Sequence, residues 1–329
     1  MRTDGDLKDL AGRIAKERGV VESFFTEFSQ HVIGQHIMVE RLFMGLVTGG
    51  HVLLEGVPGL AKTLAMRTLA ELLALEYKRI QFTPDLLPSD LIGTLVYNPK
   101  SGNFDTKKGP VFTNLVLADE INRAPAKVQS ALLEAMQEHQ VTIGETSYAL
   151  PAPFLVVATQ NPIEQEGTYP LPEAQVDRFM MKVVVGYPDK EQEKEIVRRY
   201  SQSGTQVIKA VLSLRQVEKL RHLVESIYLD EKILEYITGI VFATRNPREY
   251  GLDANLFALG ASPRASLCLA ALSRAQAFLA GRAFVLPDDV RMVTPDVLRH
   301  RILPSYEAES EGVESKDLVQ RVLEHVPVP

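Results

Sequence analysis

Residues 56–63, with the sequence Gly-Val-Pro-Gly-Leu-Ala-Lys-Thr, have the spacing of a loop that binds phosphate groups. Gly56 and Gly59 would let the backbone turn so that its N–H groups face the β- and γ-phosphates of a nucleotide. The helix expected after the loop would add the positive end of its dipole. Lys62 would neutralise the same phosphates, and the Thr63 hydroxyl would bind Mg²⁺. The loop therefore predicts a nucleotide site that works with Mg²⁺.

One position departs from the general motif, because Ala61 stands before the lysine where most such loops have glycine. The departure weakens the motif when it is taken alone. A glycine-rich turn between a strand and a helix, with an incidental lysine, is the alternative that it leaves open. We expect the following residues to bind the nucleotide: Gly56, Val57, Pro58, Gly59, Leu60, Ala61, Lys62, Thr63 and Leu64.

Two acidic residues, Asp119 and Glu120, end the apolar run Leu115–Ala118. Acids at the end of a buried strand are costly unless something uses them. Asp119 would hold Mg²⁺, directly or through water, and Glu120 would polarise the attacking water as a general base. A strand end whose acids only meet solvent is the alternative, but the order of loop and acids favours the catalytic interpretation.

Asn161 follows the fourth apolar run and precedes a proline. If this strand neighbours the strand that ends in Asp119, the amide of Asn161 would lie beside the acids. It could then orient the water or contact the γ-phosphate. A plain Asn-Pro turn is the alternative.

Two arginines could stabilise phosphate charge from outside the loop. Arg178 precedes the fifth apolar run, and an exposed arginine there could enter a neighbouring copy's site as an arginine finger; a surface pair with Asp177 is the alternative. Arg264 lies in the first turn of a predicted helix, where a cation opposes the helix dipole and should have an anionic partner. A γ-phosphate between two domains would be such a partner, and nucleotide state would then set the interdomain angle. A solvated helix start is the alternative.

The elements that must position these residues alternate between strands and helices. The short β-prone runs are Val52–Glu55, Tyr77–Phe82, Leu115–Ala118, Phe154–Ala158 and Met181–Val185. Several are continuously apolar, as in a parallel sheet covered on both faces by helices. Residues 64–75 have the apolar spacing of a helix. The pattern predicts an α/β fold with a doubly wound parallel sheet.

Two hairpins interrupt this alternation, one around the run Thr94–Tyr97 and one around residues 141–150. After residue 186 the strand signals stop and helical periodicity continues. We therefore expect residues 1–186 to form a nucleotide-binding α/β domain and residues 187–329 an all-helical lid domain. One lid helix should begin at Ser262 to Arg264 and end near Gly281.

Length and composition agree with a soluble protein of two domains. The 329 residues are 45% hydrophobic and 24% charged, which are ordinary values. The first ten residues lack the apolar core of a signal peptide, and the longest apolar run, Leu267–Leu272, is too short for a membrane helix. A single cysteine excludes an intrachain disulfide, and the histidines have no metal-ligand spacing. We expect a cytoplasmic protein. A net charge of −6 disfavours general nucleic-acid binding, though a local basic patch remains open.

Over nearly its whole length the chain resembles the MoxR family of AAA+ ATPases. Ala61, the departure noted above, is the residue that members of this family tend to carry. The stretches that resemble the family's signatures are residues 56–63 (GVPGLAKT), 81–90 (QFTPDLLPSD), 119–127 (DEINRAPAK), 132–138 (LLEAMQE), 158–162 (ATQNP) and 173–179 (EAQVDRF).

The resemblance implies a ring-forming ATPase, usually hexameric, that uses ATP and Mg²⁺. It implies that the two hairpins face the central pore or one face of the ring, and that residues Ile33, Gly34 and Gln35 lie beside the adenine, although an ordinary loop remains the alternative there. Relatives are thought to mature or activate partner proteins, often ones with a von Willebrand factor A domain. The implied site residues are Lys62 and Thr63 in Walker A, Asp119 and Glu120 in Walker B, Asn161 as sensor 1, Arg178 as the arginine finger and Arg264 as sensor 2.

Three functions stay open, with a protein-remodelling ATPase first. A nucleic-acid motor is supported by Lys100, Lys107 and Lys108 in the first hairpin, but the second hairpin has Glu145 and no basic residue. A magnesium-chelatase-like subunit for metal insertion would differ in its partner only. A small-molecule kinase is disfavoured, because it gives no role to Arg178 or Arg264.

Overall fold

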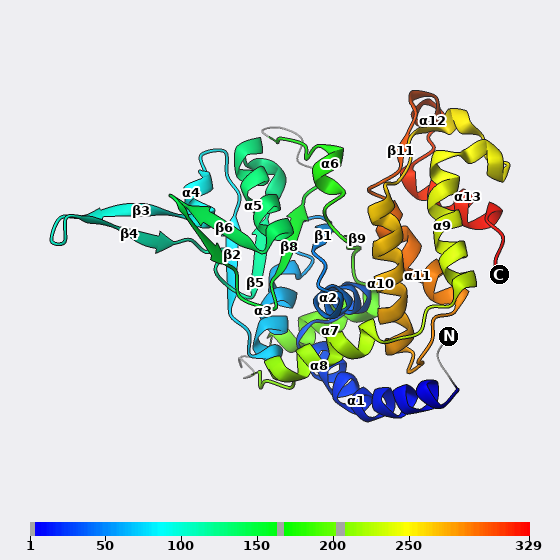
Figure 1. Ribbon diagram of the computed structural model, residues 1–329, viewed down its shortest axis with the longest axis horizontal. Helices are drawn as coiled ribbons and strands as arrows, with labels where there is room; N and C mark the ends of the chain where they lie inside the picture. The colour runs from blue at the N-terminus through cyan, green and yellow to red at the C-terminus, as the bar shows by residue number, and fades with distance from the viewer. Residues whose placement is uncertain (1–3, 163–167, 202–207) are drawn as a thin grey trace.

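A five-stranded parallel sheet lies at the centre of the computed structural model, which describes residues 4–162, 168–201 and 208–329. Its strand order is β2-β5-β8-β1-β9, and every neighbouring pair is parallel (Figure 1). The doubly wound α/β prediction is confirmed, and the strands begin and end within two residues of the predicted runs. They are β1 (Val52–Glu55), β2 (Tyr77–Gln81), β5 (Leu115–Asp119), β8 (Leu155–Gln160) and β9 (Met181–Val184).

Helices cover both faces of this sheet, because alternate strand residues point into two separate cores. Leu117 and Val157 belong to the core that α3 shares, whereas Val116 and Val156 belong to the core on the side of α5. The helices of this part are α1 (Asp4–His31), α2 (His36–Thr48), α3 (Lys62–Leu73), the short α4 (Pro88–Ile92), the 3-10 turn η1 (Ile121–Arg123), α5 (Ala126–Glu138) and the short α6 (Glu173–Val176).

Both predicted hairpins are present. The first pairs β3 (Gly93–Asn98) with β4 (Asn103–Lys108) and projects from the body, at the left of Figure 1. The second pairs β6 (Gln140–Ile143) with β7 (Thr146–Ala149). At the root of the first hairpin Gly93 has φ +103°, and a Cβ there would lie 2.2 Å from the Lys107 carbonyl oxygen, so glycine is required.

The two hairpins are joined to each other. The hydroxyl groups of Thr106 and Tyr148 are 2.9 Å apart and share a hydrogen bond. The Lys108 ammonium lies 4.8 Å from the centroid of the Phe112 ring and 5.1 Å from that of Tyr148, which is cation–π distance. The hairpins therefore form one unit.

The C-terminal part is helical except for one short antiparallel ribbon, so the expectation of an all-helical lid is corrected at that point. The ribbon's strands have three and two residues, too few to leave a period in the sequence. The elements are α7 (Lys190–Ser201), α8 (Leu214–Glu225), α9 (Glu231–Arg245), η2 (Pro247–Tyr250), η3 (Ala254–Leu256), β10 (Phe257–Leu259), α10 (Pro263–Leu279), α11 (Pro287–Leu298), β11 (Leu303–Pro304), α12 (Tyr306–Ser310) and α13 (Ser315–His325).

The predicted helix start at Ser262 is confirmed, because the Ser262 hydroxyl accepts the backbone N–H of Arg264 at 3.2 Å and caps α10. This helix ends just before Gly281, which has φ +76°. The domain boundary at residue 186 stays a prediction. Beyond it the chain returns to α3, where the N–H groups of Val211 and Leu212 donate to the Leu72 carbonyl oxygen.

A buried ion cluster joins the C-terminal part to α2. The Nε atom of Arg41 lies 2.7 Å from Oδ2 of Asp296, and Nη2 of Arg299 lies 2.8 Å from Oδ1 of the same carboxylate. The side chains of Arg41 and Asp296 are less than a tenth exposed. Because a buried charge that lost its partner would remain desolvated, this ion pair favours one relative position of α2 and α11.

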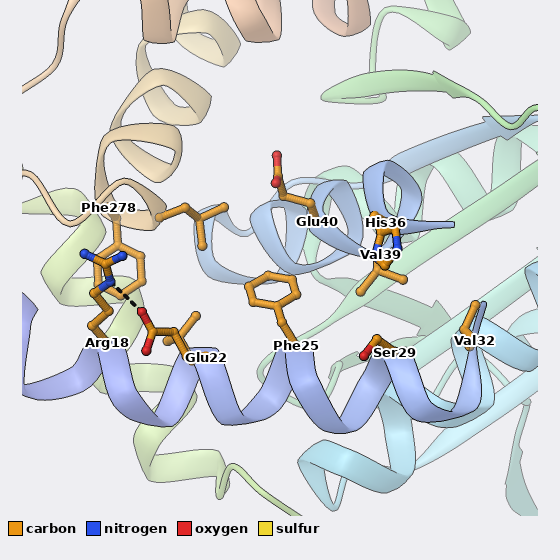
Figure 2. A pocket seen from close by; sticks show the side chains of 11 residues that line it. Arg18, Glu22, Phe25, Ser29, Val32, His36, Val39, Glu40 and Phe278 are labelled. Carbon is orange, nitrogen blue, oxygen red and sulfur yellow. Dashed lines mark hydrogen bonds and ion pairs between the residues drawn. The ribbon is translucent and has the colours of Figure 1, made fainter. Parts of the chain in front are cut away.

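The long helix α1 packs along α2, α3 and α8 and leaves one cavity of about 300 Å³ against α2 and the end of α10. Figure 2 shows Phe25 of α1 and Phe278 of α10 at this cavity, with the Arg18–Glu22 ion pair (2.7 Å) beside them. Within the described residues, no helix has both the length and the apolar character needed to cross a membrane.

Two histidines, His51 and His300, are buried. Nδ1 of His51 accepts the Val156 N–H at 3.0 Å, so Nε2 carries the proton that is donated to the Met136 carbonyl oxygen, also at 3.0 Å. Burial lowers the pKa of His51 from 6.5 to about 4. Burial also lowers the pKa of His300 well below its usual value.

These histidines should make the fold lose stability in acid. The unfolded chain takes up a proton at His51 near pH 6.5, whereas the folded chain does so only near pH 4. The stability is therefore complete above pH 6.5 and is lost as the pH falls towards 4, by about 3 kcal/mol for His51 alone. Urea unfolding across this pH range should show that the free energy of unfolding depends less steeply on pH in His51→Gln. The difference in slope should correspond to about one bound proton. The exposed His222 is the control, and an equal slope in both variants would contradict the assignment.

Candidate active site

The carboxyl ends of the strands bring most of the predicted site residues to one edge of the sheet. In the register, Gln81 lies opposite Asp119, and Glu55 lies opposite Gln160. β8 pairs with both β5 and β1, as the Asn161 prediction required. The loop after β1, the acids after β5 and Asn161 after β8 therefore share this edge, which we call the loop edge.

The loop that follows β1 depends on unusual backbone angles. Gly59 has φ +87°, and Ala61, which precedes the first residue of α3, has φ +58°. An alanine in this left-handed region costs about 1 kcal/mol more than a glycine, which is the physical reason for glycine in the general motif. At Gly56 a Cβ would lie 2.8 Å from the Val185 carbonyl oxygen, so this position needs glycine.

Lys62 begins α3, and its ammonium donates to the Gly56 carbonyl oxygen at 2.5 Å. Burial lowers the pKa of this lysine, and the negative charges of Asp119 and Glu120 oppose the change. The first turn of α3 holds no acidic residue, so its dipole also favours an incoming anion. The neighbouring Thr63 is exposed. A partly desolvated cation at a helix N-terminus is suited to a phosphate group.

The Asp119 carboxylate is held on both oxygens. Oδ1 accepts the Thr159 hydroxyl at 2.6 Å, and Oδ2 accepts Nη2 of Arg79 at 2.7 Å. The Thr159 hydroxyl oxygen also accepts the backbone N–H of Glu120 at 2.9 Å. Thr159 is fully buried, so one hydroxyl fixes both acidic residues.

The Glu120 carboxylate is oriented by two neighbouring elements. Its Oε2 atom accepts Nε2 of Gln81 from β2 at 2.7 Å and Nη1 of Arg123 from η1 at 3.1 Å. The backbone of Glu120 is left-handed, with φ +56°, and the hydrogen bond to Thr159 stabilises it there. The glutamate thus has a fixed direction at the loop edge.

Asn161 and the segment before α2 complete the loop edge. Asn161 is buried, 7% exposed, and directly follows the β8 residue that pairs with Glu55. Nε2 of Gln35 donates to the Gly186 carbonyl oxygen at 3.1 Å, next to the residue that contacts Gly56. The structure therefore brings residues 33–35 to the same end of the sheet as the loop.

Arg178 and Arg264 lie elsewhere. Arg178 precedes β9, whose first residue pairs with Val52 at the start of β1, so the length of a strand, about 13 Å, separates it from its own loop. The Nη1 atom of Arg264 lies 3.7 Å from Oδ2 of Asp177. The anionic partner expected for Arg264 is thus present within the chain, at the amino ends of the strands. We call this the finger edge.

Asp177 pairs with the C-terminal part, and its carboxylate contacts are with Ser262, Arg264 and Arg301. The alternative of an Asp177–Arg178 pair is not what the structure shows. Arg178 is half-buried, and among the described residues its side chain has no hydrogen bond or ion pair.

The described residues contain no group of three or more His, Cys, Asp or Glu side chains arranged for a metal ion. Mg²⁺ that is bound with a nucleotide needs fewer protein ligands, because phosphates and waters fill most of its coordination positions. A hydroxyl at Thr63 and a carboxylate at Asp119 are the hard oxygen donors that this ion takes, so the residues fit it.

Sequence reasoning missed the residues that hold the acids, namely Arg79, Gln81 and Thr159. It also missed Arg301 as the partner of Asp177. Gln81 is the last residue of β2 and Thr159 the last but one of β8, and these strands flank β5, so the strand order would have indicated them. Arg301 has no local signal.

Two family models match the chain, ATPase family associated with various cellular activities (AAA) over residues 51–181 and AAA lid domain over residues 252–322. The chain is 48% identical to Chaperone MoxR1 of Mycobacterium tuberculosis, over 96% of this chain and 84% of that protein. It is 42% identical to Uncharacterized protein YeaC of Bacillus subtilis, over 91% of each.

Protein MoxR of Methylorubrum extorquens is 31% identical, over 95% of this chain and 96% of that protein. The crystal structure of a "putative ATPase" from Cytophaga hutchinsonii superposes with a TM-score of 0.92 at 51% identity, over 98% of this chain and 99% of that one. The family models, the relatives and the fold agree with one another. This chain is an ATPase and belongs to the MoxR family of AAA+ proteins.

Proposed function

We propose that the chain binds ATP and Mg²⁺, assembles into a ring, hexameric as in its family, and uses hydrolysis to remodel or activate a protein partner. The observation that carries this proposal is the separation of the two edges. Lys62 and Glu120 lie at the loop edge, whereas Arg178 and Arg264 lie at the finger edge of the same chain. One chain therefore holds two half-sites that face different ways.

A ring completes each half-site with the half-site of the next subunit. The finger edge of one copy would supply Arg178 to the γ-phosphate bound at the loop edge of its neighbour. Because Arg264 is tied to Asp177, we propose that it enters the neighbour's site together with Arg178. This proposal differs from the expectation, drawn from the sequence, that Arg264 contacts a γ-phosphate between the two domains of its own chain.

At the loop edge, each residue has one proposed role. Thr63 and Asp119 would hold Mg²⁺, which neutralises phosphate charge when it is bound, and residues 33–35 would lie by the adenine. Glu120 would take a proton from the attacking water, and Asn161 would orient that water. In this division residues 1–186 form the nucleotide-binding domain and residues 187–329 the lid. We place the activity in the cytoplasm, where ATP is available.

The joined hairpins support a protein partner. Leu95, Val96, Tyr97 and Phe104 of the first hairpin are 40%, 45%, 55% and 65% exposed, an unusual group of apolar side chains on a projecting ribbon. Leu95 and Val96 have no ring to stack on a base, and the rings of Tyr97 and Phe104 pack against each other with their centroids 5.5 Å apart. Lys108 is already engaged with two rings, which weakens the nucleic-acid alternative. By family resemblance, a partner with a von Willebrand factor A domain fits this proposal. A magnesium-chelatase-like role stays an alternative.

Lys62→Ala should abolish ATP binding, whereas Glu120→Gln should preserve binding and stop hydrolysis. The lysine holds the phosphates in both states, but a general base acts only in the chemical step and contributes about 10²–10⁴-fold to the rate. Titration with a fluorescent ATP analogue and a phosphate-release assay separate these effects. Lys100→Ala, on the exposed hairpin, is the control. Equal loss of binding in both site variants would refute the division of roles.

Thr159→Val should lower kcat about 10-fold with little change in KM for ATP. The change keeps the shape of the side chain but leaves the Asp119 carboxylate and the Glu120 N–H without their shared partner, at a cost of about 1–3 kcal/mol. Steady-state ATPase kinetics measure the effect. Thr142→Val makes the same change on the exposed second hairpin and should leave the rate intact. A normal kcat for Thr159→Val would show that the acids orient themselves.

Mixing inactive variants should restore hydrolysis if sites are shared. Glu120→Gln subunits carry intact arginines, and Arg178→Ala subunits carry intact loop edges, so mixed rings contain complete sites. Arg264→Ala should behave like Arg178→Ala. The specific ATPase rate should also rise with protein concentration. A specific rate that does not change with concentration, together with no recovery on mixing, would favour a monomeric enzyme. If only Arg264→Ala fails to recover on mixing, Arg264 acts in the site of its own chain.

A further inference from the structure

Arg301, between α11 and β11, has every N–H group of its guanidinium engaged although its side chain is only 1% exposed. Nε donates to Oδ1 of Asp177 at 2.7 Å. Nη2 donates to the carbonyl oxygens of Asp177 at 2.9 Å and Phe179 at 2.6 Å. Nη1 donates to the carbonyl oxygens of Met180 at 3.2 Å and Val297 at 2.6 Å. Nη2 also lies 3.7 Å from Sγ of Cys268. Four of the five hydrogen bonds to oxygen therefore reach residues 177–180.

The residue that these contacts surround is Arg178. Its two neighbours, Asp177 and Phe179, both accept hydrogen bonds from the same guanidinium, and Phe179 is completely buried. Nε2 of the buried His300 lies 3.2 Å from the Phe179 carbonyl oxygen as well. The backbone on both sides of Arg178 is thus held by the C-terminal part. The side chain of Arg178 takes no part in these hydrogen bonds.

We propose that Arg301 is a positioning residue for Arg178, and that through it the lid sets where the arginine finger points. The inference rests on the proposed role of Arg178. It goes beyond that role because it makes the finger's position depend on a residue 123 positions further along the chain.

Arginine is suited to this task in a way that lysine is not. A guanidinium offers five N–H groups in a rigid plane, whereas an ammonium offers three from a single point. Arg301→Lys would leave at least two of the five oxygen acceptors without a donor, at least one of them within residues 177–180, and the turn would relax. A displacement of about 1 Å at a catalytic group can lower a rate about 10²-fold.

Asp177 links Arg264 to the hydrogen bonds between Arg301 and residues 177–180, which we call the clamp. Ser262, the cap of α10, donates its hydroxyl to both Asp177 oxygens at 3.1 and 3.0 Å, and Arg264 lies 3.7 Å from Oδ2. Residues 177–180 and the start of α10 are therefore fixed to each other through the Asp177 carboxylate. Movement of the lid would carry both arginines together.

The test is Arg301→Lys in the full-length chain. We expect unchanged affinity for a fluorescent ATP analogue and a fall of roughly 10–100-fold in the hydrolysis rate at saturating ATP. Mixing with Glu120→Gln subunits should restore hydrolysis, because those subunits supply a correctly held finger. In an Arg178→Ala background, Arg301→Lys should add less than about a twofold further loss.

Arg282→Lys is the matched control. Arg282 pairs with Asp289 at 2.7 and 2.5 Å inside the lid, so this variant disturbs a lid ion pair without touching residues 177–180 and should keep full activity. If Arg301→Lys does not fold, Arg301→Gln replaces it, because glutamine adds no buried charge and Arg264 remains beside the Asp177 carboxylate.

The results distinguish failure of the Arg301 inference from failure of the proposed role of Arg178. Loss of activity in Arg178→Ala together with control-like activity in Arg301→Lys would overturn the inference and keep the proposed function. Full activity in Arg178→Ala would overturn the proposed finger. A loss in Arg301→Lys that mixing does not restore would mean that Arg301 acts on its own chain's site, which also overturns the inference.

Discussion

The parallel pairing of β1 with β8 on one side and β9 on the other is the constraint on which the rest of the structure depends. Parallel strands put all their carboxyl ends at one edge and all their amino ends at the other. The loop of residues 56–61 leaves β1 at the first edge, and the turn with Arg178 enters β9 at the second. An antiparallel β9 would have put the arginine beside its own loop, and a single chain could then have held a whole site.

Charged groups at the two edges are held in different ways. At the loop edge, Asp119 and Glu120 are partly exposed and are kept in place by Thr159, Arg79 and Gln81. A nucleotide with its cation can compete for such groups, because water still screens part of their charge. At the finger edge, the Arg301 side chain is only 1% exposed and donates to several oxygens at once, so this arrangement is far harder to exchange. One edge is built for ligand exchange and the other for fixed geometry.

Local patterns in the sequence were enough to predict most of the strands and helices and the turn between β1 and α3. The five strands, both hairpins and the capped start of α10 follow from apolar runs, turn residues and the Ser262-Pro263 pair. The place of Asn161 beside the acids depended on strand order, which the structure supplied. Contacts between distant residues could not be predicted, since Asp177 and Arg301 each have ordinary surroundings in the sequence. The ribbon of β10 and β11 was missed because two or three residues carry no period.

The clamp of Arg301 has a consequence for how the chain folds. A guanidinium can leave water only when acceptors for its N–H groups are already in place, and four of these acceptors belong to residues 177–180 of the sheet domain. The cluster of Arg41 and Asp296 imposes the same condition at a second point. Docking of the helical part is therefore all-or-none: a partial approach desolvates charge without pairing it, and only one alignment satisfies both clusters. The two parts can therefore join in one register only.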